Sequence, residues 1–153
     1  VISDRIAVMD SGNVVQLGTA QEIYAKPANR FVADFIGTSN LLEGTCMGNR
    51  EVMVSGTRLE IADMPDEMSL DTRVTVSIRP EEVHILPGIE KGDNRISGQV
   101  SFVRDVGSSV EIYLDCQGLQ IVSQSTPKGR PAVTQGDQAT AVLPSAACVV
   151  LRS

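Results

Sequence analysis

Aromatic side chains are scarce in this sequence. Tryptophan is absent, and phenylalanine and tyrosine together make up 3 % of the 153 residues. The apolar fraction is still 42 %, so the chain can bury a core built from valine, isoleucine, leucine, alanine and methionine. Because β-branched residues pack well on pleated strands, this composition favours β structure.

Positive charge and metal-binding side chains are also few. Thirteen basic residues against nineteen acidic ones give a net charge of −6, which argues against nucleic acid or an anionic lipid surface as the main partner. Cys46, Cys116 and Cys148 are widely spaced, form no Cys-x-x-Cys pair and have only His84 as an imidazole companion. We interpret them as three reduced, partly buried thiols of a cytosolic protein, and we predict no metal site.

Other absences concern membranes and nucleotides. No run approaches the roughly 18 to 20 apolar residues that cross a bilayer, and no signal peptide opens the chain. No Gly-x-x-x-x-Gly-Lys-Ser/Thr loop or acidic partner strand is present to hold phosphates and Mg²⁺. We therefore expect no ATP hydrolysis, no catalytic residue and no bound cofactor. Because the chain begins at Val1 without an initiator methionine, we expect it to be an excised fragment.

The first 40 residues have a mixed pattern. Residues 5–9 and 14–17 are typical of two strands joined through a turn in which Gly12 permits a positive φ. Residues 19–22, Thr-Ala-Gln-Glu, form a capping box that predicts a helix over 20–25, ended by Pro27. A second helix is predicted from Asn29 to a stop at Gly37. Its apolar face carries Phe31, Val32, Phe35 and Ile36.

From residue 41 onward the pattern changes to short alternating runs separated by turn residues, which is typical of an antiparallel β-barrel or sandwich. Strands are predicted over 41–47, 51–54, 58–61, 74–79, 83–86, 96–103, 110–115, 119–123, 139–143 and 148–151. The clearest alternation predicts that Val74, Val76 and Ile78 face the core, whereas Thr75, Ser77 and Arg79 face away from it.

Both halves resemble parts of one family. The first half resembles the end of the nucleotide-binding domain in ATP-binding subunits of ABC importers that serve sugars, polyamines, iron or phosphonates. The matching segments are residues 4–9, Gly12, residues 16–19 and 22–24, Pro27, residues 31–37 and residues 40–42. The second half resembles the transport-associated OB (TOBE) domain of these subunits. Its matching segments are residues 77–83 (Ser-Ile-Arg-Pro-Glu-Glu-Val), residues 98–100, residues 106–111 and Gly118.

The resemblance implies a division of the chain and a role. Residues 1–40 would be the carboxy-terminal remnant of a nucleotide-binding domain, and residues 41–153 would be a mainly β regulatory domain, an OB-like antiparallel barrel. The implied partners are a second copy in a homodimer and the transmembrane permease subunits of an importer, at the cytoplasmic face of the cell membrane. ATP and Mg²⁺ would bind the rest of the parent subunit, because the family's signature and switch histidine precede the segment matched here.

A ligand site is a second hypothesis. Gly107, Ser108 and Ser109 place two hydroxyls and successive amides at a glycine turn, which can form an anion-binding concavity. The alternative is a plain hairpin loop. Arg79, held by Pro80, is either a site residue or a structural ion-pair former. An OB domain that senses an oxyanion or a transported substrate is therefore the rival function.

The remaining residues of interest have structural interpretations. His84 alternates with Val83 and Ile85 and is expected on a solvated face, and Glu81 and Glu82 are expected to be solvated carboxylates on a turn. Phe31, Phe35 and Ile36 are predicted to form an interface, because the domain that would cover them in the parent subunit is absent from this sequence. Oligonucleotide binding ranks last, since only Phe102 and Tyr113 are available for stacking in an acidic protein.

Overall fold

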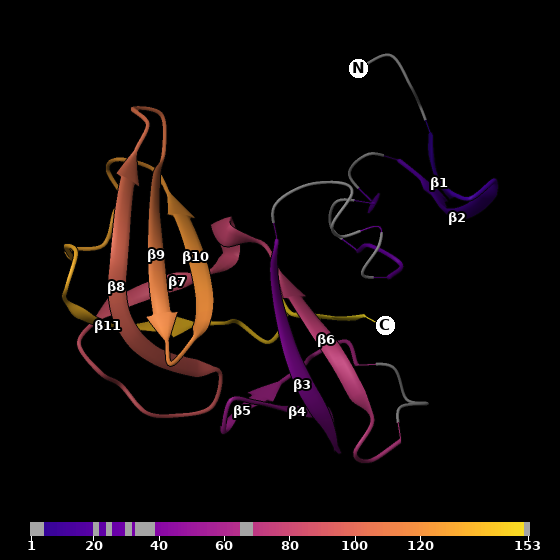
Figure 1. The fold of residues 1–153 in the computed structure, drawn as a ribbon, viewed down its shortest axis with the longest axis horizontal. Coiled ribbons are helices and arrows are strands. Elements are labelled where there is room, and N and C mark those ends of the chain that lie inside the picture. The colour runs from indigo at the N-terminus through magenta and orange to yellow at the C-terminus, as the bar shows by residue number, and fades with distance from the viewer. Residues whose placement is uncertain are drawn as a thin grey trace.

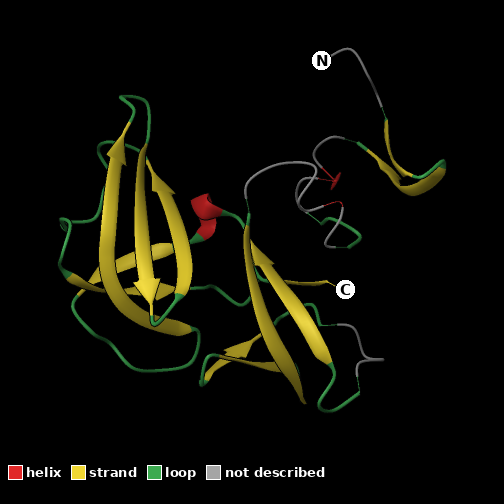
Figure 2. Cartoon of the chain, viewed as in Figure 1, coloured by secondary structure: helices red, strands yellow, loops and turns green. Residues whose placement is uncertain are grey.

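The computed structural model describes residues 5–19, 22–23, 26–29, 32, 39–64 and 69–151. The elements that these residues form are twelve strands and one short 3₁₀ helix. Figure 2 shows that strands predominate. The strands are arranged in one two-stranded and two five-stranded sheets, and every pairing is antiparallel. The prediction of a mainly β chain is therefore confirmed.

The two-stranded sheet is the amino-terminal hairpin. Strands β1 (Ile6–Asp10) and β2 (Asn13–Gly18) pair around a turn in which Ser11 and Gly12 have φ values of 51° and 84°. After this hairpin, Glu22 N donates to Thr19 Oγ1 (3.1 Å) and Thr19 N donates to Glu22 Oε1 (3.2 Å), which are the two bonds of a capping box. Most residues of the two predicted helices lie outside the described residues.

The second sheet has the order β12-β6-β3-β4-β5. Its strands are β3 (Asn40–Gly48), β4 (Glu51–Val54), β5 (Thr57–Glu60), β6 (Arg73–Ile78) and β12 (Val149–Leu151). Thr75, Ser77 and Arg79, which were predicted to face away from the core, are also at most 7 % exposed. The five residues from Val74 to Ile78 are all buried, so this sheet is covered on both faces along β6.

The third sheet has the order β10-β9-β8-β11-β7. Its strands are β7 (His84–Pro87), β8 (Arg95–Asp105), β9 (Val110–Cys116), β10 (Leu119–Ser125) and β11 (Gln138–Val142). In Figure 1 the strands β8, β9 and β10 lie in front, and β7 and β11 cross behind them. The sheet is therefore strongly curled, and its edge strands are β7 and β10.

Strand β8 makes this curl by pairing with two neighbours in succession. Its first half pairs with β11 and its second half with β9. Gly98 lies where the partner changes, and a Cβ there would lie 2.3 Å from the carbonyl oxygen of Asp115. Only glycine allows the two backbones to come this close. A register shift between Val100 and Phe102 adds to the bend.

One apolar core joins the two five-stranded sheets. It includes Leu42, Val52 and Leu59 from the second sheet and Ile112 and Leu114 from the third, all at most 1 % exposed. The 3₁₀ helix η1 (Pro80–Glu82) connects β6 of one sheet to β7 of the other. A separate small cluster of Val8, Ile23 and Val32 lies under the amino-terminal hairpin.

Candidate ligand and partner site

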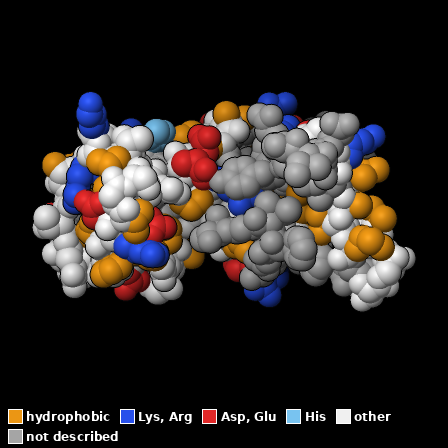
Figure 3. Space-filling model, turned by 90° about the horizontal axis from the view of Figure 1, so that it is seen from above, with side chains coloured by type: hydrophobic (Ala, Val, Ile, Leu, Met, Phe, Trp, Pro, Cys, Tyr) orange, Lys and Arg blue, Asp and Glu red, His pale blue; other side chains and the backbone are white. Residues whose placement is uncertain are grey.

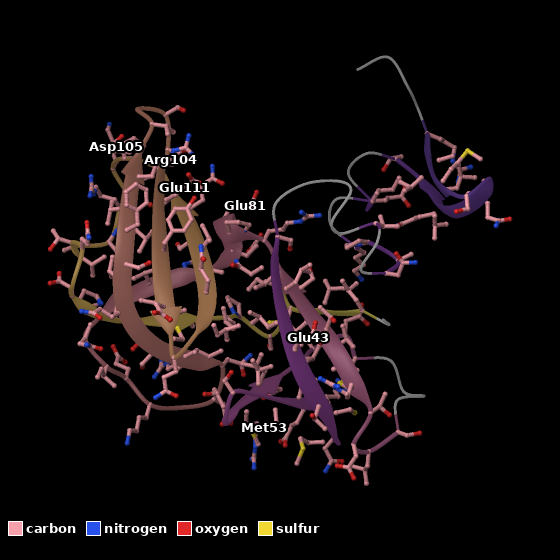
Figure 4. All side chains as sticks on the ribbon, in the orientation of Figure 1. Glu43, Met53, Glu81, Arg104, Asp105 and Glu111 are labelled. Atoms are coloured by element: carbon pink, nitrogen blue, oxygen red, sulfur yellow. The ribbon has the colours of Figure 1, made fainter. Side chains whose placement is uncertain are left out.

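A hollow of about 640 Å³ lies at the open side of the curled third sheet. It is lined by Glu81, Val83, His84, Ile85, Leu86, Ser108, Ser109, Ser123, Gln124, Ser125, Thr126, Gly129 and Pro131. The lining side chains include five hydroxyl groups and one carboxylate, but no Lys or Arg. Glu81 projects from η1 beside this region, as Figure 4 shows. The side-chain chemistry of the hollow therefore favours neutral or cationic partners over anions.

The two edge strands approach each other at one end of the hollow. Ser123, which is 2 % exposed, donates from its Oγ to the carbonyl oxygen of Val83 at 2.9 Å. Beside it, Asn40 binds both main-chain groups of Val122: Asn40 Nδ2 donates to Val122 O (2.9 Å), and Val122 N donates to Asn40 Oδ1 (2.7 Å). The Asn40 amide thus pairs with the edge of β10 as a neighbouring strand would.

The other five-stranded sheet ends in a similar way. Glu60 of the edge strand β5 donates from its N to Asn94 Oδ1 at 2.9 Å, and Asn94 Nδ2 donates to Glu60 O at 3.0 Å. The same Nδ2 donates to Leu143 O at 2.8 Å. One asparagine therefore covers part of one edge of each sheet. Sequence reasoning missed this role, because an asparagine next to a strand is also the ordinary signal of a turn.

The predicted anion loop is the turn between β8 and β9. Gly107 has a φ of 87°, and its N donates to Asp105 Oδ1 at 2.9 Å. Val106 N donates to Ser109 O at 3.0 Å. Two of the amides in this turn are thus occupied, and one of them faces a carboxylate. Ser108 and Ser109 do line the hollow.

The structure does not place Arg79 among the lining residues. Arg79 is 7 % exposed and directly precedes η1, with extended backbone angles (φ −73°, ψ 144°) imposed by Pro80. Among the predicted ligand residues, the hollow therefore brings together Ser108 and Ser109 without Arg79. The predicted interface residues Phe31, Phe35 and Ile36 lie outside the described residues.

The titratable side chains near the hollow lie as the sequence predicted. His84 is exposed between buried Val83 and Ile85, and its imidazole is pale blue in Figure 3. Glu81 and Glu82 are exposed on η1. In the part of the chain that the structure describes, no group of three or more His, Cys, Asp or Glu is arranged to hold a metal ion. Within the same residues, no helix is both long enough and apolar enough to span a bilayer.

The three thiols are all buried and free of disulfides. Burial raises the pKa of Cys116 to about 11, and the neighbouring Asp115 carboxylate adds to the effect. Burial also raises the pKa of Cys148 to about 11. Because the thiolate is the reactive form, these two side chains are part of the core packing and are chemically inert at neutral pH.

A second hollow, of about 570 Å³, lies between the turn after β4 and the connection from β7 to β8. Its lining includes the cations Arg58, Lys91 and Arg95 together with Glu90 and Asp93. Arg95 Nη1 lies 3.6 Å from Glu90 Oε1. The basic side chains that the first hollow lacks are thus in the second one, where acidic residues accompany them.

The β domain resembles a known class of domain. The profile of the TOBE domain matches residues 76–151, and this part of the chain belongs to the TOBE domain family. The cytoplasmic molybdate-binding protein ModG has the same fold. Its molybdate-bound structure superposes with a TM-score of 0.62 and 18 % identity, covering 74 % of this chain and 96 % of that chain. The predicted OB-like antiparallel fold is therefore confirmed.

Most of the chain is also similar in sequence to ATP-binding proteins of importers. The chain is 38 % identical over 125 residues to the spermidine/putrescine import ATP-binding protein PotA of Borreliella afzelii (strain PKo), covering 82 % of this chain and 35 % of that protein. It is 39 % identical over 119 residues to the sulfate/thiosulfate import ATP-binding protein CysA 2 of Chromobacterium violaceum, covering 77 % and 31 %. The chain thus spans about a third of the length of these relatives. The predicted resemblance to ATP-binding subunits of ABC importers is confirmed.

Proposed function

We propose that this chain is the carboxy-terminal part of the ATP-binding subunit of an ABC importer. Residues 1–40 complete its nucleotide-binding domain, and residues 41–153 form its regulatory domain. The observation that carries this proposal is the similarity to import ATP-binding proteins, which covers 82 % of this chain but 35 % of the first relative. The remainder of such a subunit would bind ATP and Mg²⁺, and this chain would hydrolyse none.

The amino-terminal hairpin supports the proposal independently. Val8 faces inward and is 1 % exposed, whereas Met9, Val14 and Leu17 are 54 %, 58 % and 56 % exposed. A two-stranded sheet is marginally stable alone, and apolar side chains on its outer face are typical of a surface that another part of the protein covers. In this proposal, that part is the rest of the nucleotide-binding domain.

The role of the β domain follows from this placement. It stabilises a homodimer of ATP-binding subunits and transmits regulatory signals to the nucleotide sites, as a coupling free energy between two parts of one subunit. The subunit works with the transmembrane permease subunits at the cytoplasmic face of the membrane, in the uptake of a polyamine, iron, phosphonate or sugar.

A chimera tests this proposal. The matched segment of the Borreliella afzelii protein is replaced by this chain, and a second chimera lacks residues 41–153. We expect ATP hydrolysis and dimerisation by the first chimera, and weaker dimerisation by the second, in sedimentation equilibrium. The isolated 153-residue chain should show no ATP turnover. An inactive but folded first chimera, or turnover by the isolated chain, would contradict the proposal.

Self-association of the isolated chain is a further test of the predicted interface. If the face that carries Phe31, Phe35 and Ile36 is uncovered, a second copy can bury it, for example by exchange of the helical segment. We expect a dimer in sedimentation at micromolar concentration, and a shift to monomer in Phe35→Ser. Monomer alone in the unmodified chain would count against this interface.

A small-ligand sensor is the second candidate, favoured by the hydroxyl-lined hollow. Ser108 and Ser109 lie at this hollow, and the structural neighbour ModG is a molybdate-binding protein. If an oxyanion binds here, Ser108→Ala should weaken binding in calorimetry, whereas Arg79 does not line this hollow. Absence of heat with sulfate, phosphate and molybdate would dispose of this candidate.

A further inference from the structure

The hollow presents the main-chain edges of two strands as well as their side chains. Three consecutive residues of β7 line it, His84 to Leu86, and so do three consecutive residues of β10, Ser123 to Ser125. Side chains alternate between the two faces of a strand, so consecutive lining residues mean that the edge of each strand faces the hollow. Both strands are edges of their sheet.

Along an edge strand, the main-chain N–H and C=O groups of alternate residues point towards the neighbouring strand and away from it, and this alternation identifies the groups that point into the hollow. Val122 N and O point away from β9, because both bind the Asn40 side chain. The direction repeats every second residue, so the N–H and C=O of Gln124 point the same way. Val83 O accepts from Ser123 of β10, and by the same rule the main-chain groups of Ile85 point towards the hollow.

These edge groups are not used within the described part of the chain. No hydrogen bond from the outward N–H or C=O of Gln124 or Ile85 to another described residue is found. Ser125 Oγ is buried beside them and has no hydrogen-bond partner among the described residues. A buried hydroxyl such as Ser125 Oγ requires a partner, and Ile85 beside the hollow is 6 % exposed, whereas Gln124 is exposed and open to an incoming strand. The three lining residues of each strand extend over about 10 Å, and the spacing of their main-chain groups matches that of an extended peptide.

We propose that the space between β7 and β10 is a docking site for an extended, basic peptide segment of a partner protein. The peptide adds as a strand to the edge of β10 at Gln124 and reaches Ile85 of β7 from its other side. Asn40 and Ser123 occupy the adjoining end of the same edges and so limit the site to residues beyond them. The charge preference follows from the lining, which contains no Lys or Arg, and from the net charge of −6.

The proposed site is also connected to the second sheet through hydrogen bonds. Asn40 is the first residue of β3, and the preceding Ser39 binds Ser77 Oγ and Ile78 O. A peptide strand that binds at Gln124 would therefore lie next to Asn40, which binds the same edge of β10 two residues earlier, at Val122. Binding there should slow the opening of the Asn40 contact with Val122.

The test uses a panel of capped hexapeptides with the complete chain. The first is acetyl-Lys-Val-Thr-Val-Thr-Lys-amide. The second has the same side chains with both valine nitrogens methylated, and the third has glutamate in place of both lysines. Methylation removes main-chain donors and leaves the side chains, so it separates strand addition from side-chain binding. Affinity is measured by calorimetry, and amide hydrogen exchange is followed by NMR.

Two proline variants on one strand give the matched comparison. Gln124→Pro removes an outward N–H that faces the hollow, and Gln120→Pro removes one of the same phase on the far side of Val122. Proline is tolerated on an edge strand where the N–H points outward. We expect Gln124→Pro to weaken binding of the first peptide by about tenfold or more and Gln120→Pro to change it by less than about twofold.

In the unmodified chain, the first peptide should slow exchange at the amides of Gln124, Ile85 and Val122, and the methylated and acidic peptides should bind more weakly. If a proline variant fails to fold, amide hydrogen exchange in the unmodified chain still tests whether the peptide adds as a strand. The proposal is overturned if no peptide of the panel saturates up to about 1 mM, or if methylation leaves the affinity unchanged. Equal binding of the acidic peptide would overturn its charge preference.

Discussion

The contact between Asn40 and Val122 makes a sharp prediction about stability. Asn40 is 5 % exposed, and its amide both donates to and accepts from the main chain of Val122. Asn40→Asp keeps the shape of the side chain but replaces the donor by a carboxylate oxygen. That oxygen would lie near 2.9 Å from Val122 O, so one hydrogen bond becomes a repulsive contact between two acceptors.

The size of the effect follows from the burial. Loss of the bond with an unsatisfied carbonyl costs about 1–3 kcal/mol, and the desolvated charge adds to this, so we expect a loss of roughly 2–4 kcal/mol at pH 7. A protonated carboxyl can donate to Val122 O as the amide does. The pKa of the introduced carboxyl should therefore rise in the folded state above its ordinary value of about 3.9. The penalty is then absent below that value and grows as the pH rises through the folded-state pKa.

Urea unfolding followed by circular dichroism at two pH values measures both parts of this prediction. Asn13→Asp is the control, because Asn13 is exposed at the start of β2. We expect a clear loss for Asn40→Asp at pH 7, little loss near pH 4, and a small change for the control at either pH. Equal stability of the two variants at pH 7 would refute the role given to Asn40. Asn94→Asp should repeat the pattern through Glu60.

Two further predictions concern the core. Gly98→Ala should destabilise the β domain by about 3 kcal/mol or prevent folding, because the added Cβ meets the carbonyl oxygen of Asp115. Gly18→Ala is the control: the nearest atom to its added Cβ is 3.6 Å away, so urea unfolding should show almost no change in stability. Cys116 and Cys148 should react with a thiol reagent only as fast as the chain unfolds at pH 7.5. Since the pKa of each rises from 9.0 to about 11 on folding, the unfolded chain loses these protons first. The free energy of unfolding should therefore fall between about pH 9 and 11, by roughly 1 kcal/mol per thiol at pH 10, and a Cys116→Ala, Cys148→Ala double variant should lack this part of the slope.

Local patterns in the sequence were reliable where one chemical cause dominates. The strand predicted over residues 51–54 matches β4, and the alternation of Val83, His84 and Ile85 correctly separated buried from exposed side chains. The Thr19 and Glu22 capping box was also predicted, because its two bonds lie within one turn of chain. The alternation did not predict that Thr75, Ser77 and Arg79 are buried as well. An alternating pattern indicates which side chains share a face, but it does not indicate whether a second layer covers the other face.

The candidate site shows the same limit. The sequence singled out Ser108 and Ser109, which do lie at the hollow, and grouped them with Arg79, which does not line it. Nothing in the sequence indicated that Val83 and Ser123, forty residues apart, would be joined by a hydrogen bond. Such contacts depend on how far the sheet curls.

Alternation, turn residues and family motifs are local properties, so they were enough to indicate a β-rich chain of the kind found in import ATP-binding subunits. Which strand edges meet depends on the folded arrangement of the whole chain. That outcome depends on Gly98, where close approach of two backbones bends β8, and on Asn40, whose amide closes part of an edge from 82 positions away along the chain. Curl and edge pairing arise from contacts between distant segments, so no stretch of sequence contains them.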